Sequence, residues 1–514
     1  MDRGEVLESF FLGIDAGTTT IKTCVFDARG NEVSLSARHA DPLRGSDGTV
    51  SQDMGLLWME VVSTIRDVLK AVEGKGEIKA IGVTGQGDGF WALDEQLKPV
   101  QDALLWIDGR TRSIISRWDE MGIIGNSGRV VFSGSPLAYA SWYAENAPEV
   151  LEKSRYILFC KDWIKYCLTG EIVTDPSDLS DASLIDVRKR AFSRPLLKSF
   201  DMETLLQKLP PMEKSTMIIG HVTGEAAQLT GLKLGIPVAN GMIDVAASAI
   251  GTGVVDPSMA CSIVGTTLFN EIVIDNLSGL EMEGSARPSL ICHGLEDRWL
   301  LAYGTMTGTP NVDWFLSRLL DRSCGLCLSD AQFVEELEHV GAGSGGIFYH
   351  PYLGEGGERA PFVKPSASAQ FIGLKSRHSK YHMIRAVCEG VAYSMKDCYE
   401  KFPIDPKVIR IAGGGSKNDF WCRIFSSCVG KPIQVTYGDE IGAKGAAITA
   451  ATSIGFFSSL EEGMDAMISV AKCFEPQPSE ANLYQDGYNI YRKIVDAMWD
   501  VWDEHEKFVY TCMK

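Results

Sequence analysis

The sequence has no stretch long and apolar enough to cross a membrane, and its start lacks the basic residues and apolar core of a signal peptide. Basic residues are also fewer than acidic residues. The net charge of −18 argues against nucleic acid or an anionic membrane surface as the main partner. We therefore expect neither a membrane span nor a leader, and the cytoplasm is the predicted location.

Cysteine is present, but not in the pattern of a disulfide framework or a zinc site. The 13 cysteines are an odd number, and several stand among apolar neighbours, which is typical of free buried thiols in a reducing compartment. Cys324 and Cys327 form one Cys-x-x-Cys pair without a second pair, so zinc is not expected there. The 514 residues are enough for two or three domains.

Near the N-terminus, two apolar segments flank a short turn rich in hydroxyl groups. Residues 11–14 and 21–26 are apolar, and residues 16–20 between them are Ala-Gly-Thr-Thr-Thr. This pattern predicts a β-hairpin in which Gly17 turns tightly and the amides and hydroxyls can surround an anion. Asp15 would repel a bare phosphate, which favours Mg²⁺ between them. The alternative is an ordinary Gly-Thr hairpin beside an acidic residue.

The turn differs from the two best-known phosphate loops. A Walker loop needs Gly-x4-Gly-Lys-Ser/Thr before a helix, and a dinucleotide loop also opens a helix. The residues after Thr20 alternate like a strand instead. The sequence therefore predicts a phosphate-binding turn of a different kind.

Two further segments place polar residues at strand ends. Residues 78–84 predict a buried strand that ends in Gly-Gln-Gly-Asp-Gly at 85–89, and residues 104–107 predict a short strand followed by Asp108 and Arg110. Strand ends are where α/β proteins usually bind ligands. The alternatives are a polar β-turn for the first segment and a surface ion pair for the second.

Helical periodicity predicts several helices. Asp53 is the expected N-cap of a helix over residues 54–72. Residues 132–215 are expected to be mostly helical, with Gly170 as a helix C-cap. Residues 443–451 predict a helix of small residues that can pack close to a sheet, and Tyr484 to Trp502 predict an amphipathic C-terminal helix whose aromatic stripe is core.

The most informative feature is a repeat of the opening pattern. Residues 259–274 again read as strand, Gly-Thr-Thr and strand, so that the units at Gly17 and Gly265 stand nearly half the chain apart. This repetition suggests a duplicated architecture with a cleft between the halves. We place the domain boundary between residues 1–249 and 250–514, with Gly251 and Gly253 as hinge or turn positions.

A triple-glycine turn follows the predicted strand at 408–412. Without Cβ atoms, Gly413 to Gly415 would let a flat base and ribose lie on the backbone. The turn fails the dinucleotide pattern, since Asn418 stands where the third glycine would be. The alternative is a tight strand-to-helix turn.

With these motifs in place, the chain resembles the FGGY carbohydrate kinases over nearly its whole length. The matching pieces are residues 13–19, 51–53, 85–87, 105–110, 161–163, Asp244, 265–267 and 413–415, and residues 369–374 with 382–387 resemble the second family signature. The resemblance implies an α/β protein of two actin-like (ribonuclease H-like) ATPase domains that flank a central cleft. It also implies ATP and Mg²⁺ as cofactors and a small sugar or polyol as substrate.

The resemblance implies a role for each candidate residue. Asp244 would act as general base and contact the substrate, an assignment whose alternative is a helix N-cap, and Asp15 would hold the metal. Substrate binding would involve Gln86, Gly87, Asp88, Trp106 and Asp108. ATP would be bound by Asp15, Gly17, Thr18, Thr19, Thr20, Lys22, Gly265, Thr266, Thr267, Gly414, Gly415 and Asn418, with Gly308 as a further nucleotide candidate.

Substrate identity follows from departures within the family. D-xylulose kinases usually carry Met-His after the glutamine, where this chain has Gly87 and Asp88, and Asn after the catalytic aspartate, where it has Val245. Glycerol kinases place an Arg-Glu pair near Gln86, which is missing here. The motifs are closer to the L-xylulose and erythritol kinase branches. Asp88 could accept two hydroxyl hydrogen bonds from a polyol.

Other readings stay open at this point. D-xylulose or another ketose is an alternative substrate. An actin- or chaperone-like ATPase switch would use the same hairpins, but it does not require the Gln86 to Asp88 loop or Asp244. A sugar-sensing regulator would normally carry a basic DNA-binding extension. A homodimer is compatible with the sequence.

Overall fold

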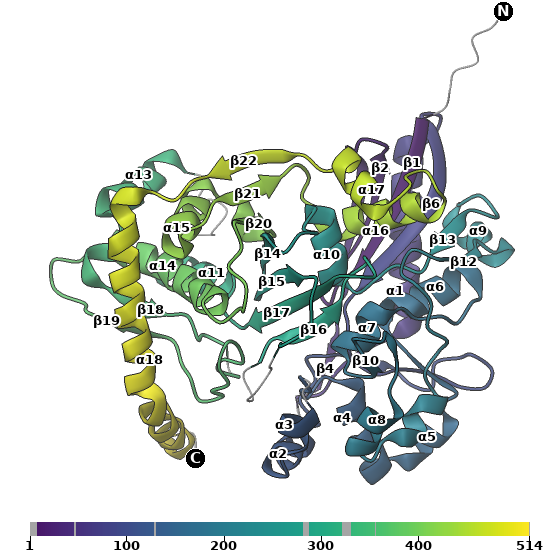
Figure 1. The fold of residues 1–514 in the computed structure, drawn as a ribbon, viewed down its shortest axis with the longest axis horizontal. Coiled ribbons are helices and arrows are strands. Elements are labelled where there is room, and N and C mark those ends of the chain that lie inside the picture. Colours follow the sequence, from purple (N-terminus) through teal and green to yellow (C-terminus); the bar gives the residue numbers. More distant parts are fainter. Residues whose placement is uncertain are drawn as a thin grey trace, which may run out of the picture.

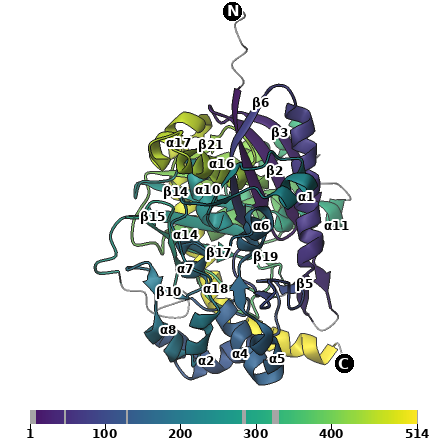
Figure 2. The same cartoon turned by 90° about the vertical axis from the view of Figure 1, so that its right-hand side faces the viewer.

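The computed structural model describes residues 8–45, 48–127, 130–280, 287–320, 330–354 and 356–512. Two halves, each built on a mixed β-sheet with helices around it, make up the molecule (Figure 1). Figure 2 shows α1 (Met54–Val72) along the outer face of the N-terminal sheet. No described helix combines the length and the apolar character needed to span a membrane.

The N-terminal sheet has six strands in the order β12-β13-β6-β1-β2-β3. The hairpin β1–β2 is antiparallel and continues into β3, while β6 and β13 run parallel to β1. The strand β12 closes the other edge antiparallel to β13. The strands are β1 (Glu8–Ala16), β2 (Thr20–Asp27), β3 (Glu32–His39), β6 (Gly76–Gly85), β12 (Ile218–His221) and β13 (Pro237–Ala239).

The C-terminal sheet repeats this design and adds one edge strand. Its order is β16-β17-β15-β14-β20-β21-β22, and without β16 every neighbouring pair has the same direction as its counterpart in the first sheet. The predicted two-domain α/β duplication is thus confirmed. The strands are β14 (Met259–Val264), β15 (Leu268–Ile274), β16 (Ser289–Cys292), β17 (Trp299–Thr305), β20 (Val408–Ala412), β21 (Ile433–Thr436) and β22 (Val470–Phe474).

Two helices of small residues join the halves. The helix α10 (Asp244–Thr252) packs against α16 (Ile441–Ser453), and α16 lies on β1 and β6 of the opposite half. Close approach depends on glycine, because a Cβ on Gly13 or Gly82 would lie 1.9 Å from the carbonyl oxygen of Ala443 or Ala446. The predicted helix over 443–451 that packs close to a sheet is therefore confirmed, and the sheet belongs to the other half.

The remaining elements surround the sheets. In the N-terminal half they are β4 (Leu43–Arg44), β5 (Val50–Gln52), β7 (Trp91–Leu93), β8 (Ala103–Leu104), α2 (Arg112–Glu120), α3 (Ile123–Ser127), α4 (Pro136–Asn146), α5 (Pro148–Lys153), β9 (Tyr156–Leu158), α6 (Cys160–Thr169), α7 (Pro176–Asp181), β10 (Ile185–Asp186), β11 (Ala191–Phe192), α8 (Arg194–Ser199), η1 (Glu203–Gln207) and α9 (Gly224–Thr230). In the C-terminal half they are α11 (Pro310–Leu320), α13 (Ala331–Val340), η2 (Ser344–Gly346), β18 (Phe348–His350), β19 (Gln370–Ile372), α14 (Lys380–Tyr399), η3 (Gly414–Lys417), α15 (Asp419–Val429), α17 (Leu460–Met467) and α18 (Pro478–Cys512).

Local predictions are largely confirmed. The Asp53 side chain caps α1 by accepting from the amides of Gly55 and Leu56, and Gly170 ends α6 in the left-handed region. The stripe on α18 that includes Tyr491 and Trp502 is buried core.

Three further expectations concern two glycines, the domain boundary and a cysteine pair. Gly253 does end α10 with φ +74°, but the turn or hinge predicted at Gly251 is wrong, because that residue lies inside the helix against the Ile441 carbonyl. The predicted boundary between residues 249 and 250 falls within the same helix and stays a prediction. The Cys324–Cys327 pair lies outside the described residues.

Candidate active site between the two halves

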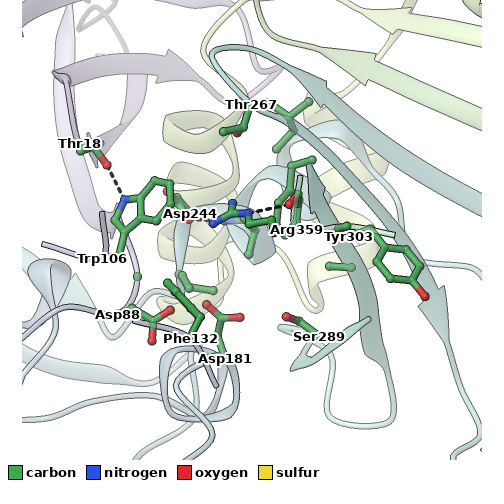
Figure 3. Close-up of a pocket in the computed structure, with 18 of the residues that line it drawn as sticks. Thr18, Asp88, Trp106, Phe132, Asp181, Asp244, Thr267, Ser289, Tyr303 and Arg359 are labelled. Carbon is green, nitrogen blue, oxygen red and sulfur yellow. Dashed lines mark hydrogen bonds between the residues drawn. The ribbon is translucent and has the colours of Figure 1, made fainter. Parts of the chain in front are cut away.

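A cavity of about 810 Å³ lies between the halves and receives residues from both (Figure 3). From the N-terminal half it is lined by the first hairpin, the loop after β6 and the start of α10. From the C-terminal half it is lined by β15, β17, the loop between β18 and β19 and the loop before α16. The predicted site residues on its wall are Asp15, Gly17, Thr18, Thr19, Thr20, Lys22, Gly87, Asp88, Trp106, Asp244 and Thr267.

The first hairpin is linked by hydrogen bonds to two neighbouring loops. The Thr18 hydroxyl donates to the Gln86 side chain at 3.0 Å and accepts from the Trp106 indole N–H at 2.8 Å. Gln86 is buried, donates to Gln52 and does not line the cavity. We conclude that Gln86 is placed to hold Thr18 and Trp106 rather than to face the open space.

The second hairpin closes on itself and on the next loop. The Gly265 amide donates to the Thr267 carbonyl at 2.9 Å, and the Thr309 amide donates to the Gly265 carbonyl at 2.7 Å. Gly308 has no space for a side chain, since a Cβ there would lie 2.2 Å from the Gly265 carbonyl oxygen. Thr267 lines the cavity, whereas Gly265, Thr266 and Gly308 do not.

Charged residues gather where β1 meets α16. Asp15 ends β1 above the first turn of α16, and a Cβ on Gly442 would lie 2.5 Å from its carboxylate. Removal from water raises the pKa of Asp15 to about 6, while the Lys22 charge opposes that rise. Lys22 on β2 forms an ion pair of 2.7 Å with Glu440 of the C-terminal half. A carboxyl group of this kind is a suitable ligand for a divalent cation.

Asp244 is the first residue of α10 and faces the same cavity. Its Oδ1 accepts from the Val245 amide at 2.8 Å. The preceding residue is fixed as well, because the Ile243 amide donates to the Ser177 hydroxyl at 2.9 Å. Removal from water, and secondarily the charge of Asp15, raise the pKa of Asp244 to about 8. A carboxyl group with a pKa near neutrality is well suited to accept and return a proton.

Asp88 is held in an unusual conformation. Its φ of +53° lies in the left-handed region, which non-glycine residues seldom adopt. Its side chain is 3% exposed, and Oδ1 has no hydrogen-bond partner among the described residues. Such strain at a cavity wall is typical of a functional position. Gly87 beside it leaves room for Ile243 and Asp181, which a Cβ would approach to 2.2 and 3.4 Å.

Asp108 lies away from the cavity. It is fully buried and accepts from the Val50 and Arg110 amides and from the Arg110 guanidinium, whose closest ion-pair contact is 2.9 Å. The ion pair considered from the sequence therefore exists, but it is buried rather than on the surface. Its carboxylate fixes the segment that presents Trp106.

The triple-glycine turn packs against the second hairpin. A Cβ on Gly413 would lie 2.7 Å from the Val264 carbonyl oxygen, and one on Gly415 would lie 2.4 Å from the Val264 side chain. The Asn418 side chain caps α15 by accepting from the Trp421 amide at 2.8 Å. Gly413 lines the cavity, while Gly414, Gly415 and Asn418 do not. Close packing alone thus accounts for part of this turn.

Six charged residues of the cavity wall were missed, namely Asp119, Asp181, Arg287, Arg359, Asp439 and Glu440, and two of them lie near Asp88. Asp181 ends α7 and faces Asp88, and Arg359 enters from the C-terminal half (Figure 3). A signal existed for each. Asp175, Asp178 and Asp181 are closely spaced, and Glu358-Arg359 follows a glycine-rich loop. Neither Asp181 nor Arg359 stands at the end of a predicted strand, so neither residue could be assigned to the cavity without the tertiary structure.

The comparisons with known proteins agree with this geometry. The model of the FGGY family of carbohydrate kinases, N-terminal domain, matches residues 10–251, and that of the C-terminal domain matches residues 275–454. An erythritol kinase of Brucella abortus is 29% identical, with 98% of each chain covered. An L-xylulose/3-keto-L-gulonate kinase of Escherichia coli is 26% identical, with 96% of this chain and 98% of the relative covered.

Solved structures show the same fold. A ligand-bound xylulose kinase from Lactobacillus acidophilus superposes with a TM-score of 0.88 at 23% identity, with 97% of this chain and 100% of that chain covered. Plasmodium falciparum glycerol kinase with ADP gives a TM-score of 0.83 at 20% identity, with 95% and 98% covered. The family models span most of the sequence. The chain therefore belongs to the FGGY family of carbohydrate kinases and is a phosphotransferase that acts on a sugar or polyol.

Proposed function

We propose that the enzyme transfers the γ-phosphoryl group of ATP to a hydroxyl of a small sugar or polyol, with erythritol and L-xylulose ranked before D-xylulose and other ketoses. One observation carries the proposal: Asp244 faces the same cavity as Thr18 and Thr267, which come from the hairpins of the two halves. Phosphoryl transfer depends on alignment and charge neutralisation more than on covalent help from the protein.

In this proposal Asp244 accepts the proton of the attacking hydroxyl. Its place at the first turn of α10 fixes the carboxyl group, and the Ser177–Ile243 hydrogen bond fixes the turn before it. The two threonine hairpins hold the phosphates from opposite sides. The triple-glycine turn and Gly308 are the proposed nucleotide contacts of the C-terminal half. The division into residues 1–249 and 250–514 belongs to the same proposal.

The residues present fit a divalent cation. Asp15 and Asp244 both face the cavity, and the negative charge of Asp15 contributes to the raised pKa of Asp244. A cation would relieve this repulsion, and carboxylate oxygens are the ligands that Mg²⁺ prefers. Asp15 would hold it, and the ion would supply charge neutralisation on the phosphates. The described cysteines are free and mostly buried, which agrees with the proposed cytoplasmic location.

The test is a measurement of ADP formation from MgATP with a panel of four- and five-carbon polyols and ketuloses, and NMR of the product to locate the phosphorylated carbon. We expect at least one neutral compound of the panel to stimulate ADP formation many-fold. ADP formation that no compound of the panel stimulates would reject the proposal and favour an ATPase switch. Size-exclusion chromatography with light scattering would test for a homodimer.

A further inference from the structure

We propose that Asp88, Asp181 and Arg359 form a subsite that takes the uncharged, hydroxyl-bearing end of the substrate and rejects a carboxylate there. The inference rests on the proposed function and narrows it to neutral polyols and ketuloses, against aldonates and keto-aldonates. Neither Asp181 nor Arg359 was predicted from the sequence. We call these three residues the acid-pair subsite.

The two carboxyl groups of the subsite face each other (Figure 3). Asp88 comes from the loop after β6 and Asp181 from the end of α7, so the pair is formed by tertiary contact. Asp88 is buried and Asp181 is half-buried, and each carboxyl lies within the other's hydrogen-bonding range. Two carboxylates this close cannot both stay ionised at low cost, so one proton is shared between them.

The pKa values of the two carboxyl groups agree with a shared proton. Burial, and then the Asp181 charge, raise the pKa of Asp88 well above its usual range, and burial raises the pKa of Asp181 to about 6. The pair then offers one O–H donor and several acceptor oxygens. A vicinal diol presents the matching donors and acceptors. The unpartnered Oδ1 of Asp88 is the acceptor that such a hydroxyl would satisfy.

The Arg359 guanidinium is already engaged by the protein. Its Nε donates to the Gly304 carbonyl at 2.8 Å, and its guanidinium carbon lies 5.3 Å from the centre of the Trp106 ring. The carboxyl groups of Glu358, Asp181 and Asp88 all act on it electrostatically. A single positive charge thus faces several acidic groups. The charge of Arg359 is already balanced by these acidic groups, so it cannot also neutralise a carboxylate of the substrate.

The other charges near the subsite do not change this balance. Asp178, which also acts on Asp88, forms an ion pair of 2.8 Å with Lys161. Arg287 lines the cavity together with Asp119, whose negative charge acts on it, and its guanidinium donates to the carbonyls of Ile124 and Gly125. A substrate carboxylate would therefore meet the acid pair as a like charge, which opposes binding.

The position of the subsite relative to Asp244 determines which end of the substrate the acid pair contacts. In Figure 3, Thr18 and Thr267 lie on one side of Asp244, and Asp88 and Asp181 lie on the other, with Phe132 beside them. Phosphoryl transfer takes place on the threonine side. The acid pair therefore contacts the end of the substrate that does not become phosphorylated, where an aldonate would carry its carboxylate.

The experiment compares kcat/KM for erythritol and L-xylulose with kcat/KM for the aldonates of equal carbon number. For the unmodified enzyme we expect a preference for the neutral compounds of about 100-fold or more, since a like-charge contact weakens binding by about two or more tenfold steps. Equal values for the neutral and acidic compounds would overturn the inference and leave the proposed function standing. Absence of activity on every neutral compound would overturn the proposed function itself.

Two variants sharpen the test. In Asp181→Asn and in Asp88→Asn the side-chain shape is kept and one acid is removed, so the preference for neutral compounds should fall at least about 10-fold. Asp186→Asn is the matched control, because Asp186 lies five residues further along, caps a turn through the Arg188 amide and does not line the cavity. Thermal unfolding and MgADP binding report whether each variant is folded. An unchanged preference in folded Asp181→Asn would remove Asp181 from the subsite.

Discussion

The two threonine hairpins have the same topology and differ in charge. At the positions where the first hairpin has Asp15 and Lys22, the second has Ile263 and Asn270. Asp15 and Lys22 face the cavity, while the Asn270 side chain is buried and accepts from the Ser262 hydroxyl. The duplication therefore supplies one half with ionic groups at these positions and the other with uncharged side chains. In the proposed function, the charged hairpin holds the metal and both hairpins hold phosphate oxygens.

The sheets behind the hairpins differ in the same sense. Gly13 on β1 lets α16 approach to backbone contact, whereas the corresponding residue of β14 is Cys261. The helix of the C-terminal half is thereby pressed onto the N-terminal sheet. Glu440, which precedes this helix, reaches Lys22, and Gly442 reaches Asp15. The first hairpin is therefore completed by the second half of the chain, which ties its geometry to the contact between the halves.

The largest effect should come from the acid at the start of α10. Asp244→Asn removes the proposed proton acceptor and keeps its shape, so turnover should fall about 10²- to 10⁴-fold while MgATP binding is kept. ADP formation and calorimetric MgATP titration measure the two quantities. Asp256→Asn, an exposed acid just before β14, is the control and should keep full turnover. Near-normal turnover in Asp244→Asn would reject the assignment.

The contact between α16 and the first sheet is the next test of the asymmetry. In Gly13→Ala the new Cβ would meet the Ala443 carbonyl, and the overpacking should lower the free energy of unfolding by about 1–3 kcal/mol or more. Gly265→Ala, in the second hairpin, adds a Cβ whose nearest atom is 3.9 Å away and should change stability little. Gly224→Ala, where nothing lies within 4 Å, is the control. Equal unfolding temperatures for all three would contradict the comparison.

The charge of the first hairpin should be visible in pH dependence. The pKa of Asp244 is raised to about 8, so the ionised base is lost as the pH falls, and kcat/KM should rise with pH through that pKa. In the metal-free protein, Asp15→Asn removes a negative charge and should lower the pKa of Asp244, as ¹³C NMR of the carboxyl groups would show. Ile263→Asn, at the corresponding position of the second hairpin, should leave it in place. If Asp15→Asn left the pKa of Asp244 unchanged, the two carboxyl groups would not be electrostatically coupled.

Smaller effects than that of Asp244→Asn should come from the hairpin hydroxyls. Thr267→Val loses one charge-assisted hydrogen bond to a phosphate, about 1.5–3 kcal/mol, and should raise KM for ATP roughly 10- to 100-fold. Thr18→Val should also raise KM for the sugar, because the Thr18 hydroxyl holds the Trp106 indole and the Gln86 side chain. Steady-state kinetics with each substrate varied separates the two constants. Equal effects of both variants on the sugar KM would show that the hairpins do not differ in this way.

Much of the fold could be predicted because its signals are local. The strand–Gly-Thr-Thr–strand pattern, the Asp53 cap and the small residues of α16 each act within a few residues. The interpretation of Gly251 as a hinge failed for a reason of the opposite kind. A glycine inside a helix is needed there only because another helix passes against it at the Ile441 carbonyl, and that helix lies far away in the sequence.

The candidate site was predicted unevenly for the same reason. Asp15, Asp88, Trp106 and Asp244 stand at ends of strands or helices, and the structure places all of them on the cavity wall. Asp108 has a similar local setting but is turned inward by Arg110 and the Val50 amide. Asp181 and Arg359 gained their place through the packing of α7 and of the loop between β18 and β19. Their role in binding stays a proposal, as does that of the predicted residues.

The sequence by itself determined the duplicated hairpins and the aspartate at the start of a helix, because short-range backbone preferences and local spacing are enough to specify them. Its motifs also carried the resemblance to the family. Only the tertiary structure decided that α16 crosses onto the opposite sheet and that an acid pair faces Arg359 at one end of the cavity. Those contacts join segments more than 90 residues apart, such as Asp88 and Asp181. Long-range packing sets the distances between these groups, and the distances determine their pKa values and protonation states.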